Sequence, residues 1–338
     1  MILITGSTGL VGSHLLAQLL ADHPKIRATK RASSDLSSFR SILKQYYPDP
    51  EAMEARVEWV TANITDIPAL EAVFEGITHV YHCAAYISFD PKNFHKLKKS
   101  NIEGTANIVN LCLKNGVNKL VHVSSIATLG EEPDGKAMDE SSDWNPEAQN
   151  SVYAITKYGA EMEVWRGQQE GLSTAIVNPG VIIGPGDWNS GSCVIFKQAA
   201  RGIPRYTSGS CGFVSVWDVV KAMRILMEGD IAAERYVLVA ENWKYKRFIE
   251  TICSALGAKP PKRSISKKSM LVLAWLDGLR ATITGGKAQL HKDTVESLYT
   301  NSPFDGTKAL SIPGFSYQDL DKAIKMTAAV YSSEVLAP

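Results

Sequence analysis

Tyr153 and Lys157 are the residues whose types and spacing point most directly to chemistry. They lie four positions apart in a segment with helical periodicity, so their side chains share one face. A phenol ordinarily titrates near about 10, and a neighbouring ammonium group lowers that pKa by favouring the phenolate. Tyr153 would then give a proton to a carbonyl or take one from a hydroxyl. Ser124 and Ser125 end a predicted strand, where a hydroxyl can hydrogen-bond the reacting oxygen.

A glycine-rich segment near the start of the chain has the pattern of a phosphate-binding turn. Gly6, Gly9 and Gly12 stand between a short apolar strand and a helix with apolar periodicity. The first glycine permits a tight turn, the second lets a pyrophosphate approach backbone N–H groups, and the third lets the helix pack closely on the strand. The pattern predicts a dinucleotide site, with cofactor contacts from Gly6, Ser7, Thr8, Gly9, Leu10, Val11 and Gly12.

The residues after the second predicted strand bear on which dinucleotide is bound. A carboxylate there accepts hydrogen bonds from the ribose hydroxyls of NAD, whereas an arginine suits the 2′-phosphate of NADP. This chain has Lys30 and Arg31 followed by two serines, with no acidic residue before Asp35. The cations favour NADP, and NAD stays as the alternative because two solvated surface cations would give the same pattern. Asn63, after the third strand, either faces the adenine or serves as a turn residue.

These residues are spaced along alternating strands and helices. Strands are expected at 2–4, 26–30, 57–62, 79–83, 119–124 and 173–178, and helices at 13–21, 36–45, 101–115 and 152–169. This alternation predicts an α/β fold, a Rossmann-type doubly wound parallel sheet whose ligands bind at the carboxyl ends of the strands. We expect a dinucleotide-binding domain at 1–180 and a smaller C-terminal substrate lobe at 181–338, with 213–240 returning to the first domain.

Composition excludes several classes of protein. The 36 Lys and Arg nearly balance the 35 Asp and Glu, so no nucleic-acid partner is expected. Met1 leads directly into an apolar strand without a signal-peptide pattern, and the apolar stretch 270–276 is too short to cross a bilayer. That stretch predicts a buried or lid helix without stable membrane insertion. No metal site is expected, and a cytoplasmic location is favoured, because the cysteines are scattered and form no CxxC pair: Cys83, Cys112, Cys193, Cys211 and Cys253.

Together these motifs resemble the extended short-chain dehydrogenases/reductases of the NAD-dependent epimerase/dehydratase superfamily. The matching pieces run nearly end to end: Thr5-Gly6-x-x-Gly9-x-x-Gly12, His82-Cys83-Ala84-Ala85, Asn101-x-x-Gly104-Thr105, Val123-Ser124-Ser125, Tyr153-x-x-x-Lys157, Asn178-Pro179-Gly180 and Phe213-Val214-x-Val216-x-Asp218. The resemblance implies Ser125, Tyr153 and Lys157 as catalytic residues. Ser125 is preferred over Ser124 because it lies five positions before Gly130, as in the family's S-x-x-x-x-G pattern.

The resemblance also implies further contacts and an assembly. Tyr153 and Lys157 would contact the cofactor, with Lys157 holding the nicotinamide ribose. A homodimer would form by packing the helices at 101–115 and 152–169 of two subunits into a four-helix bundle. The cofactor contacts added by the family pattern are Ile64, Ala84, Ala85, Asn101 and Pro179.

Three functions remain open at this point. The chain resembles dihydroflavonol reductases and hydroxysteroid dehydrogenases in its NADP-type second strand and in the loop 131–150, which favours an NADP(H)-dependent carbonyl/alcohol reductase acting on a small or apolar substrate. The alternative is a nucleotide-sugar epimerase/dehydratase with tightly bound NAD. Members of that branch tend to carry a pyrophosphate-binding arginine where this chain has Cys211, although Arg205 could substitute. A non-catalytic dinucleotide sensor is the third, and it would usually lack Tyr153 or Lys157.

Overall fold

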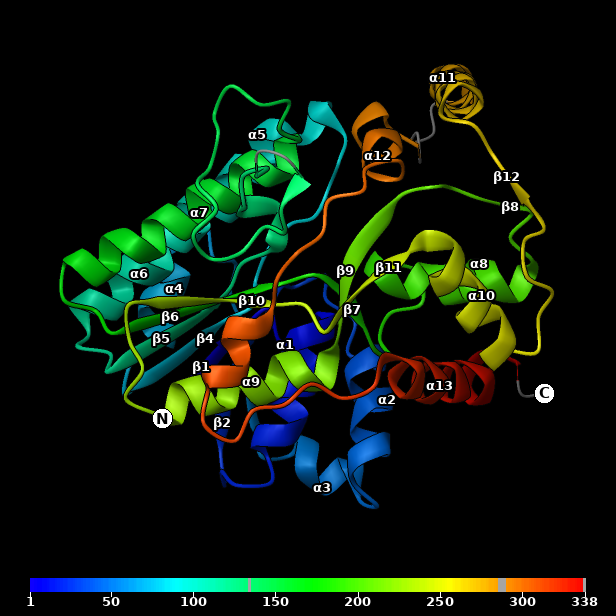
Figure 1. Cartoon of the computed structure of the whole chain (residues 1–338). Helices are drawn as coiled ribbons and strands as arrows, with labels where there is room; N and C mark the ends of the chain where they lie inside the picture. Colours follow the sequence, from blue (N-terminus) through cyan, green and yellow to red (C-terminus); the bar gives the residue numbers. More distant parts are fainter. Residues whose placement is uncertain (133–134, 285–289, 337–338) are drawn as a thin grey trace.

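Seven parallel strands form the central sheet in a computed structural model that describes residues 1–132, 135–284 and 290–336 (Figure 1). The strand order is β10-β6-β5-β4-β1-β2-β3, so the winding direction reverses between β1 and β4. Ligands of doubly wound sheets bind at this switch point. The predicted fold class is confirmed. The strands are β1 (Ile2–Thr5), β2 (Ile26–Lys30), β3 (Val57–Thr61), β4 (His79–His82), β5 (Lys119–Val123), β6 (Thr174–Pro179) and β10 (Glu234–Leu238).

Helices cover both faces of this sheet, which explains why its inner strands are buried almost throughout. On one face, α1 (Leu10–Leu19), α2 (Ser37–Tyr46) and α9 (Val216–Glu228) bury an apolar cluster that includes Leu15, Phe39 and Met223. The short helix α3 (Pro50–Glu54) packs against α2. On the opposite face, α4 (Ile67–Val73), α6 (Gly104–Lys114) and α7 (Val152–Gln169) bury a second cluster. The two faces are visible in Figure 1 as layers above and below the sheet.

Two helix starts differ from the sequence prediction. Helix α1 begins at Leu10, three residues early, because the turn closes with a 3.0 Å hydrogen bond from the Gly9 N–H to the Gly6 carbonyl. The helix expected at 101–115 is preceded by a wider π-type turn, η2 (Lys98–Glu103), which follows η1 (Pro91–Asn93) and α5 (Phe94–Leu97). Helical bends of this kind occur often at functional sites.

The C-terminal part of the chain is built on a smaller sheet of order β11-β9-β7. Its strands are β7 (Val181–Ile183), β9 (Ser210–Ser215) and β11 (Glu241–Lys244). A third apolar cluster joins this sheet to α8 (Val194–Arg201), α10 (Tyr245–Ala255) and α13 (Leu320–Tyr331). The remaining elements are η3 (Ile126–Thr128), η5 (Gly191–Cys193), β8 (Arg205–Tyr206), β12 (Arg263–Ser264), α11 (Lys267–Thr284), α12 (Lys292–Ser297), η6 (Thr307–Ser311) and η7 (Ser332–Leu336).

The segment 213–240 is divided between the two sheets. Strand β10 pairs in parallel with β6 at the edge of the central sheet, and α9 packs against β5 and β6. Strand β9 instead pairs with β7 and β11. The chain therefore crosses between the sheets more than once, and the division into a dinucleotide domain and a substrate lobe stays a prediction.

Candidate active site

The turn between β1 and α1 can be built only with glycine at two of its positions. Gly6 has a φ of +71°, and a Cβ there would lie 2.5 Å from the Ala84 nitrogen. A Cβ on Gly12 would lie 2.2 Å from the Gly6 carbonyl oxygen. Gly9 precedes α1 with no side-chain cap, so the first N–H groups of that helix have no side-chain acceptor. This is the arrangement that binds a pyrophosphate.

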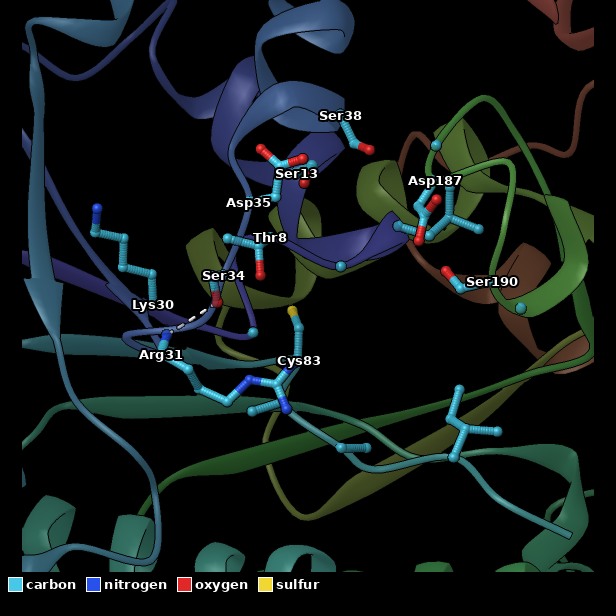
Figure 2. A pocket seen from close by; sticks show the side chains of 18 of the residues that line it. Thr8, Ser13, Lys30, Arg31, Ser34, Asp35, Ser38, Cys83, Asp187 and Ser190 are labelled. Atoms are coloured by element: carbon cyan, nitrogen blue, oxygen red, sulfur yellow. Dashed lines mark hydrogen bonds between the residues drawn. The ribbon is translucent and has the colours of Figure 1, made fainter. Parts of the chain in front are cut away.

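A cavity of about 810 Å³ lies against this turn, at the switch point of the sheet. Figure 2 shows Thr8 from the turn, Ser13 from α1, the residues after β2, and Asp187 and Ser190 from the segment after β7 around the same space. Residues 186–193 were not among the predicted cofactor contacts. The predicted cofactor contacts that line the cavity are Gly6, Thr8, Gly9, Leu10, Lys30, Arg31, Asn63, Ile64, Ala84 and Ala85.

Three other predicted cofactor residues support the turn from behind. The buried Ser7 hydroxyl donates to the carbonyls of Ile4 at 2.9 Å and Thr29 at 3.1 Å, which fixes the turn to β1 and β2. Val11 is buried in the apolar cluster under α1, and Gly12 gives the close approach described above. The structure places these three residues outside the cavity lining. Their contribution to binding would be through the shape of the turn or through backbone groups.

Asn101 and Pro179 also lie outside the cavity lining. The Asn101 side chain accepts a 2.7 Å hydrogen bond from the Tyr86 N–H and donates to the Tyr86 carbonyl at 3.0 Å. It also donates to the Thr156 hydroxyl at 3.1 Å. Asn101 therefore ties the segment after β4 to α7, one turn from Tyr153. Pro179 is buried at the end of β6.

The cavity has a mixed charge where β2 ends. Lys30 and Arg31 diverge there in Figure 2, and the Arg31 N–H donates to the Ser34 hydroxyl at 3.0 Å. Asp35 also lines the cavity, and hydrogen bonds from Ser37 hold the pKa of the Asp35 carboxyl below its usual range. The carboxylate is thus engaged with the start of α2, while Arg31 is exposed with its guanidinium available to an anion.

Tyr153 and Lys157 lie one turn apart on α7, at the carboxyl end of β5 and outside the cavity lining. Helix α7 starts at Val152, where the Ser151 hydroxyl caps it by accepting from the Ala154 N–H at 3.1 Å. The buried Lys157 ammonium donates to the Val123 carbonyl at 2.8 Å, and burial lowers the Lys157 pKa to about 8. Burial raises the pKa of Tyr153, against the effect of a hydrogen bond with the Ser125 side chain. The phenol is therefore protonated in the free protein and positioned as an acid.

The two candidate serines have different partners. The buried Ser124 hydroxyl donates to a Glu161 carboxylate oxygen at 2.6 Å. The half-buried Ser125 hydroxyl accepts from the Ala127 N–H at 3.1 Å and lies beside Tyr153. A Cβ on Gly130 would lie 1.7 Å from the Asp143 carbonyl oxygen, so the following loop can pack there only against glycine. These contacts support Ser125 as the residue that faces the reacting oxygen.

Glu161 is the centre of a buried network that the sequence motifs did not reveal. Its carboxylate accepts from Thr128 at 2.9 Å and Asn178 at 2.9 Å, in addition to Ser124. Arg235 of β10 forms an ion pair with it at 3.0 Å. Glu161 follows Lys157 by four residues, so the stripe 153, 157, 161 on α7 was the only signal in the sequence.

Cys211 lies in β9 at the position where a sugar-nucleotide enzyme tends to carry arginine. It packs with the apolar cluster of Ile126, Met138 and Phe304, behind the serine end of β5. Burial raises the pKa of its thiol. Arg205, the suggested substitute, is exposed on β8, which pairs with β12. The position of Cys211 offers no charge to a pyrophosphate.

The sequence profile of the NAD dependent epimerase/dehydratase family matches residues 2–238. The chain belongs to this family, as its motifs predicted, and it is an NAD(P)-dependent enzyme of the extended short-chain dehydrogenase/reductase type.

Named relatives cover most of the chain. A putative dihydroflavonol 4-reductase of Synechocystis is 27% identical over 327 residues, which are 95% of this chain and 91% of the relative. Sterol demethylase protein B of Methylococcus capsulatus is 28% identical over 276 residues, which are 81% of this chain and 80% of the relative.

Solved structures share the fold over the full length. The crystal structure of gox2253 superposes with a TM-score of 0.80 at 26% identity and covers 100% of this chain and 99% of its own. The NAD complex of Thermus thermophilus UDP-glucose 4-epimerase superposes with a TM-score of 0.75 at 20% identity, with 99% of each chain covered, which shows the fold alone.

Proposed function

We propose that the protein is an NADP(H)-dependent reductase that interconverts a carbonyl and an alcohol on a small or apolar substrate. The observation that carries this proposal is that Tyr153, Lys157 and Ser125 gather at the carboxyl end of β5, while a cavity of about 810 Å³ lies against the glycine turn of the same sheet. The glycine turn fits a dinucleotide because a Cβ at Gly6 or Gly12 would fill the space that the backbone needs. A nicotinamide bound there would supply or accept the hydride.

The proton chemistry belongs to this chain's own residues. Ser125 donates a hydrogen bond to the substrate oxygen and holds it beside the Tyr153 hydroxyl. Tyr153 gives its proton to that oxygen as the carbonyl is reduced, or takes it in the reverse direction. The Lys157 ammonium stabilises the phenolate that remains, because opposite charges favour each other strongly in a buried site. Its 2.8 Å bond to the Val123 carbonyl holds it on the β5 side of Tyr153.

The preference for NADP rests on the charges after β2. Lys30 and Arg31 supply two cations, and the carboxylate of Asp35 is occupied by Ser37. A 2′-phosphate placed there would gain charge-assisted hydrogen bonds that a ribose hydroxyl cannot make.

An apolar substrate is supported by the rim around Tyr153. The Phe89 ring lies 5.4 Å from the Tyr153 ring, between centroids, and Phe89 is 38% exposed. Ile87 lines the cavity and is also exposed. The names of the relatives, a dihydroflavonol reductase, a sterol demethylase protein and cinnamoyl-CoA reductases, point to the same kind of substrate.

A nucleotide-sugar epimerase or dehydratase with tightly bound NAD is the second candidate, because the family to which the chain belongs includes epimerases and dehydratases. The apolar packing of Cys211 stands against it. No observation favours the non-catalytic sensor, since Tyr153 and Lys157 are both present and in place. The five free cysteines support the proposed cytoplasmic location.

Equilibrium binding of NADPH and NADH, followed by addition of a UDP-sugar, separates the two candidates. We expect tighter binding of NADPH and no effect of the sugar. Arg31→Asp should weaken NADPH by about tenfold or more and leave NADH nearly unchanged, because one charge-assisted contact is lost. Lys44→Asp changes an exposed cation on α2 outside the cavity and serves as the control. Equal weakening of both cofactors by Arg31→Asp, or tighter NADH binding with the UDP-sugar, would contradict the proposal.

A further inference from the structure

Helix α11 exposes a regular apolar stripe. Val272, Trp275, Leu276 and Leu279 are 57%, 67%, 46% and 44% exposed, respectively. Their spacing is i, i+3, i+4 and i+7, so they form one face of the helix. Four large apolar side chains in a row on one surface mark an interaction site more often than a chance arrangement.

The position of α11 leaves this stripe accessible. The helix lies at the outer edge of the molecule beside α12, away from the central sheet (Figure 1). Another face of α11, including Leu271 and Ala274, lines a second cavity of about 630 Å³ together with Asp90 and Lys92. Trp275 lies at the boundary between that cavity and the exposed stripe. The inner face of α11 thus lies against other parts of the protein, whereas the stripe is exposed to solvent.

Positive charge is concentrated next to the stripe. The sequence from 259 to 276 contains five lysines and arginines and no acidic residue: Lys259, Lys262, Arg263, Lys267 and Lys268. Lys267 pairs with Glu296 of α12. Lys262, Arg263 and Lys268 are exposed, and no ion pair holds them within the described ranges. Lys268 precedes Val272 by one turn and lies on the same face.

We infer that α11 docks the protein on an anionic membrane surface. An apolar stripe with a tryptophan suits the interface between headgroups and acyl chains, and adjacent lysines and arginines bind anionic lipid. The burial of apolar area and the attraction to anionic lipid both add to the binding strength of such a helix. None of the described helices is long and apolar enough to cross a membrane, so the attachment is to the surface.

The positive charges next to the stripe favour an anionic lipid surface over a second copy of the chain as its partner. A symmetric dimer through the stripe would bring two sets of unpaired lysines and arginines together, and their repulsion would oppose association. An anionic lipid surface neutralises the same charges. The inference concerns attachment only and does not depend on the proposed reduction reaction.

Co-sedimentation with vesicles tests the attachment. The full chain is mixed with vesicles of phosphatidylcholine, or of phosphatidylcholine with phosphatidylglycerol, at low and high salt. We expect binding to the anionic vesicles that weakens with salt. Leu276→Asp should reduce the binding by at least roughly tenfold, because a side chain that would enter the interface becomes charged. Lys262→Glu with Arg263→Glu should reduce it by a similar factor.

Leu310→Asp is the matched control, because Leu310 is 53% exposed on η6 and lies outside the stripe. Circular dichroism and NADPH binding show whether each variant is folded. Vesicle binding is measured without turnover, so a negative result for membrane attachment is distinct from a failure of the proposed reductase activity. The inference would be overturned if the wild-type protein does not co-sediment with anionic vesicles. Equal vesicle binding by Leu276→Asp and wild type would also overturn it. The same holds if Leu276→Asp abolishes self-association of the protein and leaves its vesicle binding unchanged.

Discussion

At the residue scale, Lys157 combines a cost to stability with a proposed role in catalysis. Its ammonium is buried against the Val123 carbonyl, one helical turn from Tyr153, and burial lowers its pKa to about 8, although Glu161 acts to raise it. A cation held in such a place destabilises the folded chain but stabilises a phenolate next to it. The same argument explains why Tyr153 is protonated in the free protein, since burial raises its pKa.

The low pKa of Lys157 predicts a pH dependence of stability. The unfolded chain holds this proton up to the ordinary lysine pKa of 10.5, whereas the folded chain releases it above about 8. Between these values the unfolded state holds more protons, so the Lys157 contribution to stability rises with pH. Lys157→Met removes the contribution. We expect the free energy of unfolding of wild type, relative to Lys157→Met, to gain on the order of 2 kcal/mol from pH 8 to pH 10 in urea titrations.

If the difference in free energy of unfolding between wild type and Lys157→Met stays constant from pH 8 to pH 10, the lowered pKa of Lys157 is contradicted. The comparison with Lys157→Met cancels the titration of all groups that the two proteins share. The variant should also lose most of its turnover at every pH, because the phenolate loses its counter-charge.

Sequence reasoning at this scale pointed to Tyr153 and Lys157, whose roles stay predictions, and could not separate Ser124 from Ser125 without a family pattern. The difference lies in a partner 37 positions away, since Ser124 donates to Glu161. The pattern itself has a physical cause, because Gly130 leaves room for the Asp143 carbonyl. Contacts between residues so far apart along the chain cannot be predicted from the local sequence.

At the element scale, α7 connects the reactive residues to the rest of the sheet. Glu161 is fully buried, and its oxygens join α7 to β5 through Ser124 and to β10 through Arg235. Arg235 also donates to the Glu140 carbonyl at 2.7 Å, which fixes the loop before α7. The Trp144 ring stacks on Tyr158 with centroids 4.6 Å apart and holds the same loop. The helix and its preceding loop therefore form one support for Tyr153.

Glu161→Gln is expected to destabilise the protein by about 3 kcal/mol or more, because it leaves the Arg235 charge without its buried partner. Chemical unfolding measures this loss. Glu163→Gln on the same helix breaks the partly exposed pair with Arg166 and should cost less than about 1 kcal/mol. Adding Arg235→Met to Glu161→Gln should recover part of the loss. Equal stability of Glu161→Gln and wild type would show that the ion pair does not hold α7.

Apolar periodicity and glycine turns were sufficient to predict the first six strands of the central sheet and four of the helices that cover it. The exceptions depend on contacts between distant segments. The π-type turn η2 forms where Asn101 reaches the backbone of Tyr86. The segment 186–193 closes one side of the cavity although its sequence has no recognisable motif. Its place follows from the packing of β7 on β9, which no local pattern encodes.

At the scale of the whole molecule, the faces of α6 and α7 turned away from the sheet are the proposed dimer surface. Ile155 and Met162 are 39% and 36% exposed on α7. A bundle of these two helices with their copies would bury both side chains.

Met162→Arg should therefore shift the protein toward monomer by at least about tenfold in dissociation constant, because each copy would place an unpaired charge in the interface. Sedimentation velocity over a concentration series measures the change. Met326→Arg on α13, where Met326 is 40% exposed, is the control. A wild-type monomer, or a Met162→Arg dimer as tight as wild type, would refute this surface.

Transfer of deuterium from NADPH labelled at its hydride-bearing carbon tests the central claim most directly. The labelled cofactor is incubated with a ketosteroid, a dihydroflavonol or an aromatic aldehyde, and products are examined by mass spectrometry. We predict an alcohol that carries one deuterium, with Tyr153→Phe retaining NADPH binding and losing turnover by about a hundredfold or more. The account would be contradicted if the protein converts a UDP-sugar with tightly bound NAD and without deuterium transfer from NADPH. Unchanged turnover in Tyr153→Phe would contradict it as well.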